Sequence, residues 1–416
     1  MLKSENWPSR PASLANLGDL TTNSSLVRLD WIDVLRGIAI LMVILIHVGT
    51  SCEALQSSIK NFTDYGSRGV QLFFIVSAFT LFRAVSQKFG AKSFYIRRYA
   101  RIAPMFFLAM IFYAIMSYFG WGKQAFNEGG ISTYMLVIPF LQGLSPYGYN
   151  SLVPGGWSVA CEFLFYYSLP FLAFFCGGFR STLVVLCLSL IEAGIWTRLY
   201  QGHIAAFFSG PTAPLDPNGL VGDFTNFAFF YQLPVFVSGM LLVYVNADAV
   251  LHSCATSKIW RGAIRALPYL ALIILLAAAA SGNAALQSRT VTIFVLFFLV
   301  LGFRLSPRNL LVNKAIILIG KYSYSIYLVH FVFLDPCMKI TTQLLPNHPP
   351  ILQLIVAFGL VTTSSFIIGM VTYRFIEDPF IKLGHRLSSV IDPRNRATEI
   401  PAQRPQQAEC WQQSAP

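Results

Sequence analysis

Two basic side chains lie in the first strongly apolar stretch of the chain, where lipid would disfavour them. Arg36 and His47 fall in a segment that is otherwise apolar from Trp31 to Val48. A central arginine costs roughly 2.5–3.5 kcal/mol on membrane-insertion scales. In a helix the two residues would be about 20° apart around the axis and about 16 Å apart along it. They share one face, and we expect that face to line a protein interior with a chemical task at each end.

A second group consists of titratable residues that would lie at one depth. Under an inside-to-outside first span, His47 falls near the outer surface. Glu162 follows one to two turns after Gly155, where another span enters from outside, and His330 lies near the outer end of the ninth span. A neutral histidine close to a carboxylate can take a proton from a hydroxyl or carry an acyl group. The three residues predict an acid/base centre, although each alone could be a buried polar group of the bundle.

A basic motif precedes the third apolar stretch on its cytoplasmic side. Arg97, Arg98 and Arg101 fall close together, and Arg97 and Arg101 would be neighbours on one helix face. Guanidinium groups suit phosphate oxygens. The alternative is a topology-setting loop that contacts lipid headgroups. With Arg36 just above it, the motif is expected to bind a multiply phosphorylated donor, whose activated acyl group would cross the bilayer to an acceptor outside.

The elements that must position these residues are membrane-spanning helices. The chain is 55% hydrophobic and 12% charged, with a mean hydropathy of +0.59, whereas soluble proteins carry about 25% charged residues. We therefore expect an all-α polytopic membrane protein with about ten transmembrane helices. The stretches of spanning length are 31–51, 69–86, 102–119, 157–176, 181–199, 224–245, 264–281, 290–306, 315–335 and 351–375.

The placement of basic residues favours ten spans with both termini in the cytoplasm, as the positive-inside rule prefers. The basic residues then expected outside are Lys60, Arg68, Lys123, Arg198, Arg289 and Lys339. An eleventh span at 131–144 would place more basic residues outside than inside. We therefore expect a short re-entrant or interfacial helix at 131–144.

Three regions are expected along the chain: a cytoplasmic segment at 1–30, a membrane domain at 31–380 and a disordered cytoplasmic tail at 388–416. The first segment lacks the apolar core of a cleaved signal peptide, and the tail is rich in proline and glutamine. The seven cysteines show no paired spacing, so neither a disulfide framework nor a metal site is expected. The net charge of +12 follows from cytoplasmic loops, and no nucleic-acid partner is expected.

Five segments, in order, resemble the acyltransferase-3 family of bacterial integral-membrane acyltransferases, which includes O-antigen and exopolysaccharide O-acetylases. They are residues 32–47, 69–77, 97–104, 156–162 and 320–330. The resemblance implies a ten-helix fold in the bacterial cytoplasmic membrane, acyl-CoA (usually acetyl-CoA) as donor and no permanently bound cofactor. It also implies a glycan hydroxyl as acceptor and polysaccharide biosynthesis or export proteins as partners. Ala78 and Val159 depart from the family pattern by small apolar exchanges.

The resemblance also implies site residues. We expect His47 and Glu162 to be catalytic, with His47 acting either as general base or as transient acyl carrier and Glu162 orienting it. The expected substrate-binding residues are Arg36, Arg97, Arg98, Arg101, Trp157, Ser158, Tyr324 and His330.

Two other function classes remain open at this point. In a proton-coupled secondary transporter the buried histidines, glutamate and arginine would form a relay, although no inverted repeat is detectable. A scaffold in a polysaccharide export complex is the second.

The chain ends soon after its last span, so we expect a stand-alone transferase without the SGNH hydrolase domain of some members. The loop at 200–223, rich in proline and glycine, would face outside as an acceptor-shaping or plain connection.

Overall fold

The computed structural model describes residues 30–52, 55–87, 90–120, 135–146, 148–150, 153–200, 220–245, 250, 257–307 and 309–391. In these residues all regular structure is helical, as the composition predicts. The α-helices are α2 (Asp30–Ser51), α3 (Ser57–Asp64), α4 (Arg68–Gln87), α5 (Ala91–Tyr118), α7 (Gly156–Phe175), α8 (Phe179–Leu199), α10 (Leu220–Phe227), α11 (Phe229–Leu241), α13 (Lys258–Ser281), α14 (Arg289–Leu305), α15 (Lys314–Lys321), α16 (Ser323–Leu344), α17 (Pro350–Thr372) and α18 (Asp378–Ile391). Short 3-10 helices are η2 (Tyr65–Ser67), η3 (Gln142–Leu144) and η5 (Leu242–Tyr244), and η6 (Tyr373–Glu377) is a π-helix.

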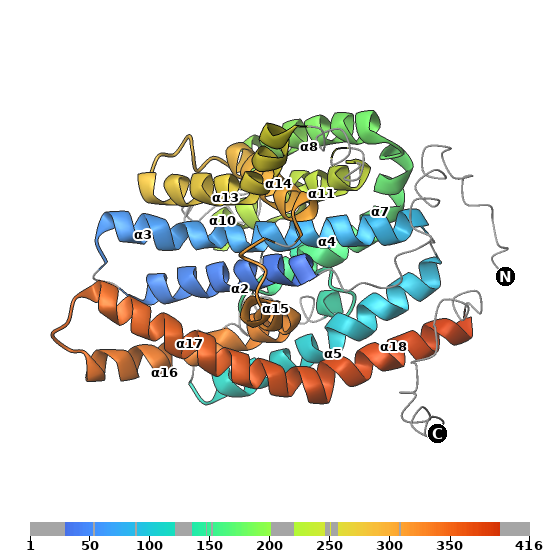
Figure 1. Cartoon of the computed structure of the whole chain (residues 1–416). Coiled ribbons are helices and arrows are strands. Elements are labelled where there is room, and N and C mark those ends of the chain that lie inside the picture. The colour runs from blue at the N-terminus through green and yellow to red at the C-terminus, as the bar shows by residue number, and fades with distance from the viewer. Residues whose placement is uncertain are drawn as a thin grey trace, which may run out of the picture.

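The long helices form a bundle of roughly aligned rods, seen from the side in Figure 1. Among the described residues, eight helices are long and apolar enough to cross a membrane, and nine if one bent pair is counted as a single span. Many large apolar side chains point outward; Phe171 is 66% and Phe174 63% exposed. Side chains of this kind are stable outside when the surroundings are hydrocarbon. The chain is a polytopic membrane protein.

All ten stretches expected to span are helical, but not all as simple rods. The stretch at 290–306 corresponds to α14, a helix of 17 residues. The stretch at 69–86 continues an apolar helix that begins at Ser57, and the stretch at 351–375 belongs to a longer one that runs from Pro350 to Ile391. At 131–144, the described residues 135–144 contain a single helical turn and η3, which together are too short to cross a bilayer.

The ninth expected span, 315–335, is wrong as a single rod. It breaks at Tyr322, where α15 and α16 meet at 81°, and α15 is seen nearly end-on in Figure 1. Glycines on the two partner helices let α15 approach α2 closely, because a Cβ at Gly320 would overlap the backbone of Asp33 and a Cβ at Gly37 would overlap that of Ile316. This contact brings the break beside the first turns of α2.

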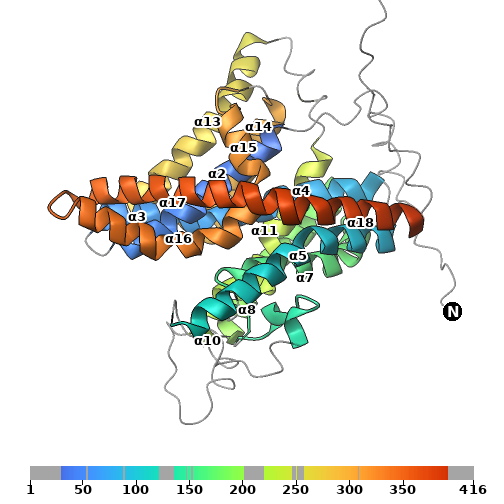
Figure 2. The ribbon, with the colours of Figure 1, turned by 90° about the horizontal axis from the view of Figure 1, so that it is seen from below.

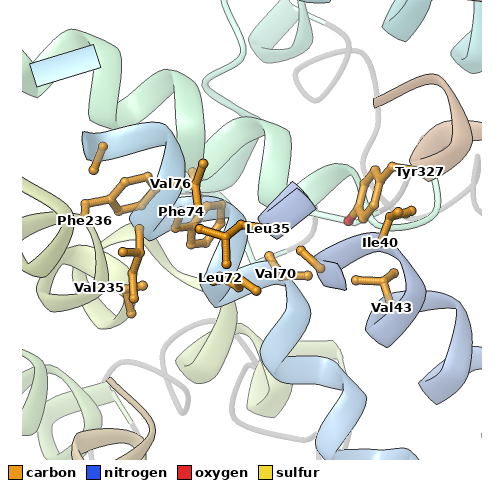
Figure 3. Packing of buried hydrophobic residues seen from close by; sticks show 14 of the residues in the cluster. Leu35, Ile40, Val43, Val70, Leu72, Phe74, Val76, Val235, Phe236 and Tyr327 are labelled. Carbon is orange, nitrogen blue, oxygen red and sulfur yellow. The ribbon is translucent and has the colours of Figure 1, made fainter. Parts of the chain in front are cut away.

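The packed centre of the bundle lies between α2, α4, α11 and α16. Figure 3 shows Leu35 of α2 beside Leu72 of α4, and Ile40 of α2 beside Tyr327 of α16. Phe236 of α11 is stacked against Phe74 of α4, with ring centroids 4.4 Å apart. These side chains are almost completely buried. Dense packing of this kind holds side chains in single rotamers, so α2 and α16 have a fixed position relative to each other.

Two helices on the expected cytoplasmic side extend further than expected. The basic motif at 97–101 lies within α5 rather than in a loop, and α18 runs to Ile391, four residues into the tail expected from 388. The two helices lie side by side in Figure 2, and a Cβ at Gly384 of α18 would touch Ala100 of α5. Their contact buries Ser388, which explains why the helix continues. The rest of the expected tail and most of the loop at 200–223 lie outside the described residues.

Candidate functional site

A basic vestibule opens where α2, α5, α15 and η6 meet. It is a cavity of about 410 Å³, and its lining includes Arg36, Arg101 and Lys321. The Arg36 guanidinium lies 3.5 Å from the Asp33 carboxylate. The Lys321 ammonium lies 5.2 Å from the ring centre of Tyr322 and 5.4 Å from that of Tyr373. Three cations around one opening make the vestibule suited to an anion.

A second, smaller cavity continues from the vestibule into the bundle. This inner cavity has a volume of about 100 Å³, and it shares Arg36, Thr80 and Arg101 with the vestibule. Arg98 adds a third guanidinium to its wall, and the Nε atom of that residue is buried without a hydrogen-bond partner among the described residues. The two cavities therefore form one basic route with Arg36 and Arg101 at their junction.

Glu162 supplies the negative charge of the inner cavity. Its carboxylate accepts hydrogen bonds from the hydroxyl of Ser77 and, at 2.5 Å, from that of Tyr166. It is near enough to Arg36 and Arg98 to interact with both electrostatically. Glu162 is thus bound into the arginine-lined cavity, where it partly balances the guanidinium charges.

The three arginines of the basic motif do not act as one group. Arg98 and Arg101 line the inner cavity, whereas the Arg97 guanidinium donates a hydrogen bond of 3.3 Å to Ser388 on α18. Arg97 and Arg101 are neighbours on α5, as expected for a helix, but only Arg101 of this pair lines the inner cavity. Residues three apart also share a helix face, and α5 is oriented so that the face with Arg98 and Arg101 points into the inner cavity.

The inner cavity ends at a hydrogen-bonded closure between α7 and α16. The Tyr327 hydroxyl donates to the Gly155 carbonyl at 2.8 Å and lies 2.8 Å from the Ser158 hydroxyl. Gly155 has a φ of +75°, and a Cβ there would lie 2.6 Å from the Tyr327 oxygen. Only glycine suits both the left-handed backbone and this close approach.

Beyond the closure lies the histidine pair, His47 of α2 and His330 of α16. Their ring centroids are 5.3 Å apart, and both rings pack on Phe331, at 4.5 and 4.1 Å. His330 is fully buried. The Nδ1 atom of His330 lies 2.6 Å from the Tyr327 carbonyl oxygen. The two histidines meet at one depth, as the sequence predicts.

The expected contact of Glu162 with His47 is wrong. Tyr324 lines the inner cavity together with Glu162, so α16 and α7 run antiparallel around the contact of Tyr327 with Ser158. Glu162 lies four residues inward of Ser158, and His330 lies three residues outward of Tyr327. Glu162 and His330 are therefore about 10 Å apart along the helix axes. The error arises because span ends inferred from hydropathy do not fix depth to within a turn.

Two more predicted residues lie around this route. The hydroxyl of Tyr324 donates a 2.8 Å hydrogen bond to the Ile102 carbonyl, which fixes its ring in the cavity wall. Trp157 packs between Phe74 and Phe227, with ring centroids 6.0 and 4.5 Å away, and does not line the inner cavity. Trp157 therefore braces the start of α7.

Glu377 is a polar residue of the site that the sequence reasoning missed. It is 2% exposed, accepts a 2.9 Å hydrogen bond from Ser325 and interacts electrostatically with Arg101 and Arg36. It belongs to η6, and π-helices often occur at functional sites. An acidic pair, Glu377 and Asp378, immediately after the last apolar stretch was the available signal. Ser77 and Tyr166 were missed too, since a lone hydroxyl in an apolar span is unremarkable.

A third cavity, of about 850 Å³, is a different kind of feature. Its lining is apolar and aromatic, with Tyr95 and Phe107 of α5 on one wall and Phe380 of α18 on the other. It lies on the face of α5 opposite Arg98 and Arg101 and holds no charged side chain.

The described residues contain no cluster of three or more histidine, cysteine or acidic side chains that could hold a metal ion. The basic route and the histidine pair are therefore the candidate site.

Comparison with known proteins identifies the family of the chain. Residues 29–370 match the family described as an acyltransferase domain, Acyl_transf_3. The chain is also similar to a peptidoglycan O-acetyltransferase, OatA, of Listeria monocytogenes serovar 1/2a, with 25% identity over 402 residues. That alignment covers 88% of this chain and 57% of the relative, so the chain spans little more than half of the relative's length. No solved structure matches significantly.

The family match includes Arg36, the basic motif, Glu162 and both histidines, and it covers most of the chain. Among the three function classes left open by the sequence, it favours acyl transfer over a transporter and over a scaffold. The chain is a multi-pass membrane protein that belongs to the acyltransferase-3 family.

Proposed function

We propose that this enzyme transfers an acyl group, in the first instance acetyl, from cytoplasmic acyl-CoA to a hydroxyl of an extracytoplasmic or lipid-linked glycan. The observation that carries the proposal is that the vestibule and the inner cavity share Arg36 and Arg101. A donor with several phosphates and a narrow uncharged arm matches a wide basic chamber that leads into a narrow one. The relative named as a peptidoglycan O-acetyltransferase supports a glycan acceptor.

The donor would bind with its phosphates in the vestibule. Arg36, Arg101 and Lys321 surround that space, and charge-assisted hydrogen bonds from guanidinium groups to phosphate are among the strongest in proteins. The inner cavity, at about 100 Å³, has room only for the thioester end. We include Arg98 as a donor-binding residue because its Nε atom is buried and unpartnered.

The chemical step would take place at the histidine pair. As the acceptor hydroxyl attacks the thioester carbon, its proton passes to His47, the new carbon–oxygen bond forms and the carbon–sulfur bond breaks. His47 then returns the proton to the departing thiolate, so the products are the ester and free CoA thiol. If His47 carries the acyl group itself, a carbon–nitrogen bond to His47 first forms while the carbon–sulfur bond breaks, and the imidazole proton passes to the thiolate. The acceptor oxygen then attacks the acyl carbon, the carbon–oxygen bond forms, the carbon–nitrogen bond breaks and the hydroxyl proton returns to the imidazole. For the thioester to reach His47, the Tyr327 side chain must leave its place between Gly155 and Ser158.

Location and partners follow from the same proposal. The vestibule would face the cytoplasm, where acyl-CoA is made, and the histidine pair would face the opposite side of a bacterial cytoplasmic membrane. Proteins of polysaccharide biosynthesis or export would supply the acceptor. Both termini are then cytoplasmic, in agreement with the charge distribution of the sequence.

The test is mass spectrometry of surface glycans from three strains: the producing strain, a deletion strain and the deletion strain that expresses His47→Ala. We expect an acyl mass that is lost on deletion and that the variant does not restore, although immunoblots show equal protein. Complementation with the unaltered chain is the positive control. Full restoration by His47→Ala would remove the catalytic role of His47, and identical glycans in all strains would contradict a glycan acceptor.

A further inference from the structure

The histidine pair contains one nitrogen atom whose task the proposed function leaves unexplained. His330 has no solvent exposure, and its Nε2 atom is buried without a hydrogen-bond partner among the described residues. An unpartnered polar atom in a dry interior costs about 1–3 kcal/mol. An atom kept at that cost points to a partner that is present during part of the reaction cycle.

The other ring nitrogen fixes what Nε2 can do. The Nδ1 atom of His330 lies 2.6 Å from the carbonyl oxygen of Tyr327. A carbonyl oxygen only accepts hydrogen bonds, so Nδ1 must carry the hydrogen. In the neutral ring, Nε2 then holds the lone pair and acts as an acceptor. Tyr327, through its backbone, therefore selects the tautomer of His330.

The nearest candidate donor is His47. Its ring lies 5.3 Å from that of His330, with an angle of 39° between the planes. No hydrogen bond joins the two rings in this structure, and a small rotation of His47 about its side-chain bonds would bring an N–H toward Nε2. The Tyr327 hydroxyl is already bound to Gly155 and Ser158, and Phe331, the other ring against His330, offers no polar hydrogen.

We infer that His330 is the positioning residue for His47: its Nε2 atom accepts the N–H of His47 and turns the other His47 nitrogen toward the reacting hydroxyl. The inference rests on the proposed function and gives His330 the orienting task that the sequence analysis assigned to Glu162. A base held by a third group is the usual arrangement in nucleophile–base systems. His330 gains and loses no proton, because the hydroxyl proton travels through His47 to the CoA thiolate.

Two variants separate hydrogen bonding from packing. His330→Phe keeps a flat ring but removes the acceptor, whereas His330→Gln offers an amide oxygen in a place similar to Nε2. We expect kcat of acetyl transfer to fall on the order of 100-fold in His330→Phe, with an unchanged KM for acetyl-CoA. On a logarithmic scale, the kcat of His330→Gln should recover at least about a third of the fall seen in His330→Phe. His348→Gln, at an exposed histidine in the turn between α16 and α17, is the matched control.

A readout that needs no acyl transfer keeps this inference separable from the proposed function. The protein, labelled with 15N in its six histidines and reconstituted in nanodiscs, gives imidazole nitrogen shifts that report tautomers directly. We expect His330 with hydrogen on Nδ1, and His47 as one tautomer in the unaltered protein and in His330→Gln but as a mixture in His330→Phe. Spectra of His47→Gln and His330→Gln assign the two rings.

The outcomes are distinct. A single His47 tautomer in an enzyme that transfers no acyl group would support the pairing and overturn the proposed function. Active protein in which His330→Phe keeps both kcat and the His47 tautomer would overturn the inference alone. A loss of kcat in His330→Phe that His330→Gln does not relieve, with an unaltered His47 tautomer and melting temperature, would also overturn it.

Discussion

At the arginine end of the site, two cavities and two irregular helix segments surround Arg36 and Arg101, whereas at the histidine end two helices press His47 and His330 against Phe331. The first end has space and charge. The second is closely packed, with His330 fully buried and His47 partly buried, and the hydrogen-bonded Tyr327 lies between the two ends. A donor that must enter and leave needs the open end, and a proton transfer needs the fixed one.

The difference predicts that substitutions at the two ends change different kinetic constants. The largest effect is expected for His47→Gln, which should lower kcat about 1000-fold and leave the KM for acetyl-CoA within about twofold, because no donor phosphate would contact this end. The measurement is steady-state acetyl transfer in proteoliposomes. A variant with normal kcat and raised KM would break the comparison.

At the other end, Arg101→Gln should raise the KM for acetyl-CoA. The loss of one charge-assisted hydrogen bond of about 1.5–3 kcal/mol corresponds to roughly 10- to 100-fold, and kcat at saturating donor should change much less. Arg97→Gln is the matched control, because the Arg97 side chain donates to Ser388 on α18. Equal effects of the two variants on KM would contradict the division of the basic motif.

The closure between the two ends can be tested with a pair of glycines. Gly155→Ala places a Cβ against the Tyr327 hydroxyl on a backbone with φ of +75°, and we expect it to cost about 1–3 kcal/mol of stability and several-fold in kcat. Gly120→Ala has the same backbone strain, with φ of +76° and nothing within 4 Å. The melting temperature in detergent and kcat are compared. If Gly120→Ala has equal effects on both, backbone strain alone explains them.

The smallest effect is expected at the rim of the vestibule. Lys321 lines the vestibule but not the inner cavity, so Lys321→Gln should raise the KM for acetyl-CoA only about two- to threefold at low ionic strength. Exposed charges are screened at high salt, and the difference from the unaltered protein should disappear near 1 M salt. A KM change that persists at high salt would place Lys321 in direct contact with the donor.

Residue types predicted the candidate site better than the membrane depths inferred from hydropathy did. Arg36 and His47 were identifiable because each is costly in an apolar helix, and the structure puts Arg36 in both cavities and His47 against His330. Glu162 was recognised as a site residue by its type, but its partners are Ser77, Tyr166 and the arginines. A carboxylate whose predicted depth is wrong by two helical turns meets different partners, and hydropathy does not resolve depth to within two turns.

The two irregular segments differ in how far the sequence announces them. The bend at Tyr322 has no proline beside it and is associated with tertiary contacts such as that of Gly320 with α2. The π-helix at 373–377 is followed by Pro379, which has no N–H to donate to the Phe375 carbonyl and whose ring crowds that carbonyl. That proline was an available signal of irregularity, but the contact of Glu377 with Ser325 depends on a helix that is distant in sequence.

The depth of the vestibule also has an electrical consequence. Its opening reaches Arg36 inside the bundle, so water and ions can enter to that level and the membrane voltage would fall mainly across the dry layer between Arg36 and the histidines. Carrying one elementary charge through a full potential of 100 mV takes about 2.3 kcal/mol. In the proposed reaction the phosphates stay on the wet side of that layer and only a neutral acyl group passes through it. Export of the acyl group would therefore proceed at nearly the same rate in energised and de-energised membranes.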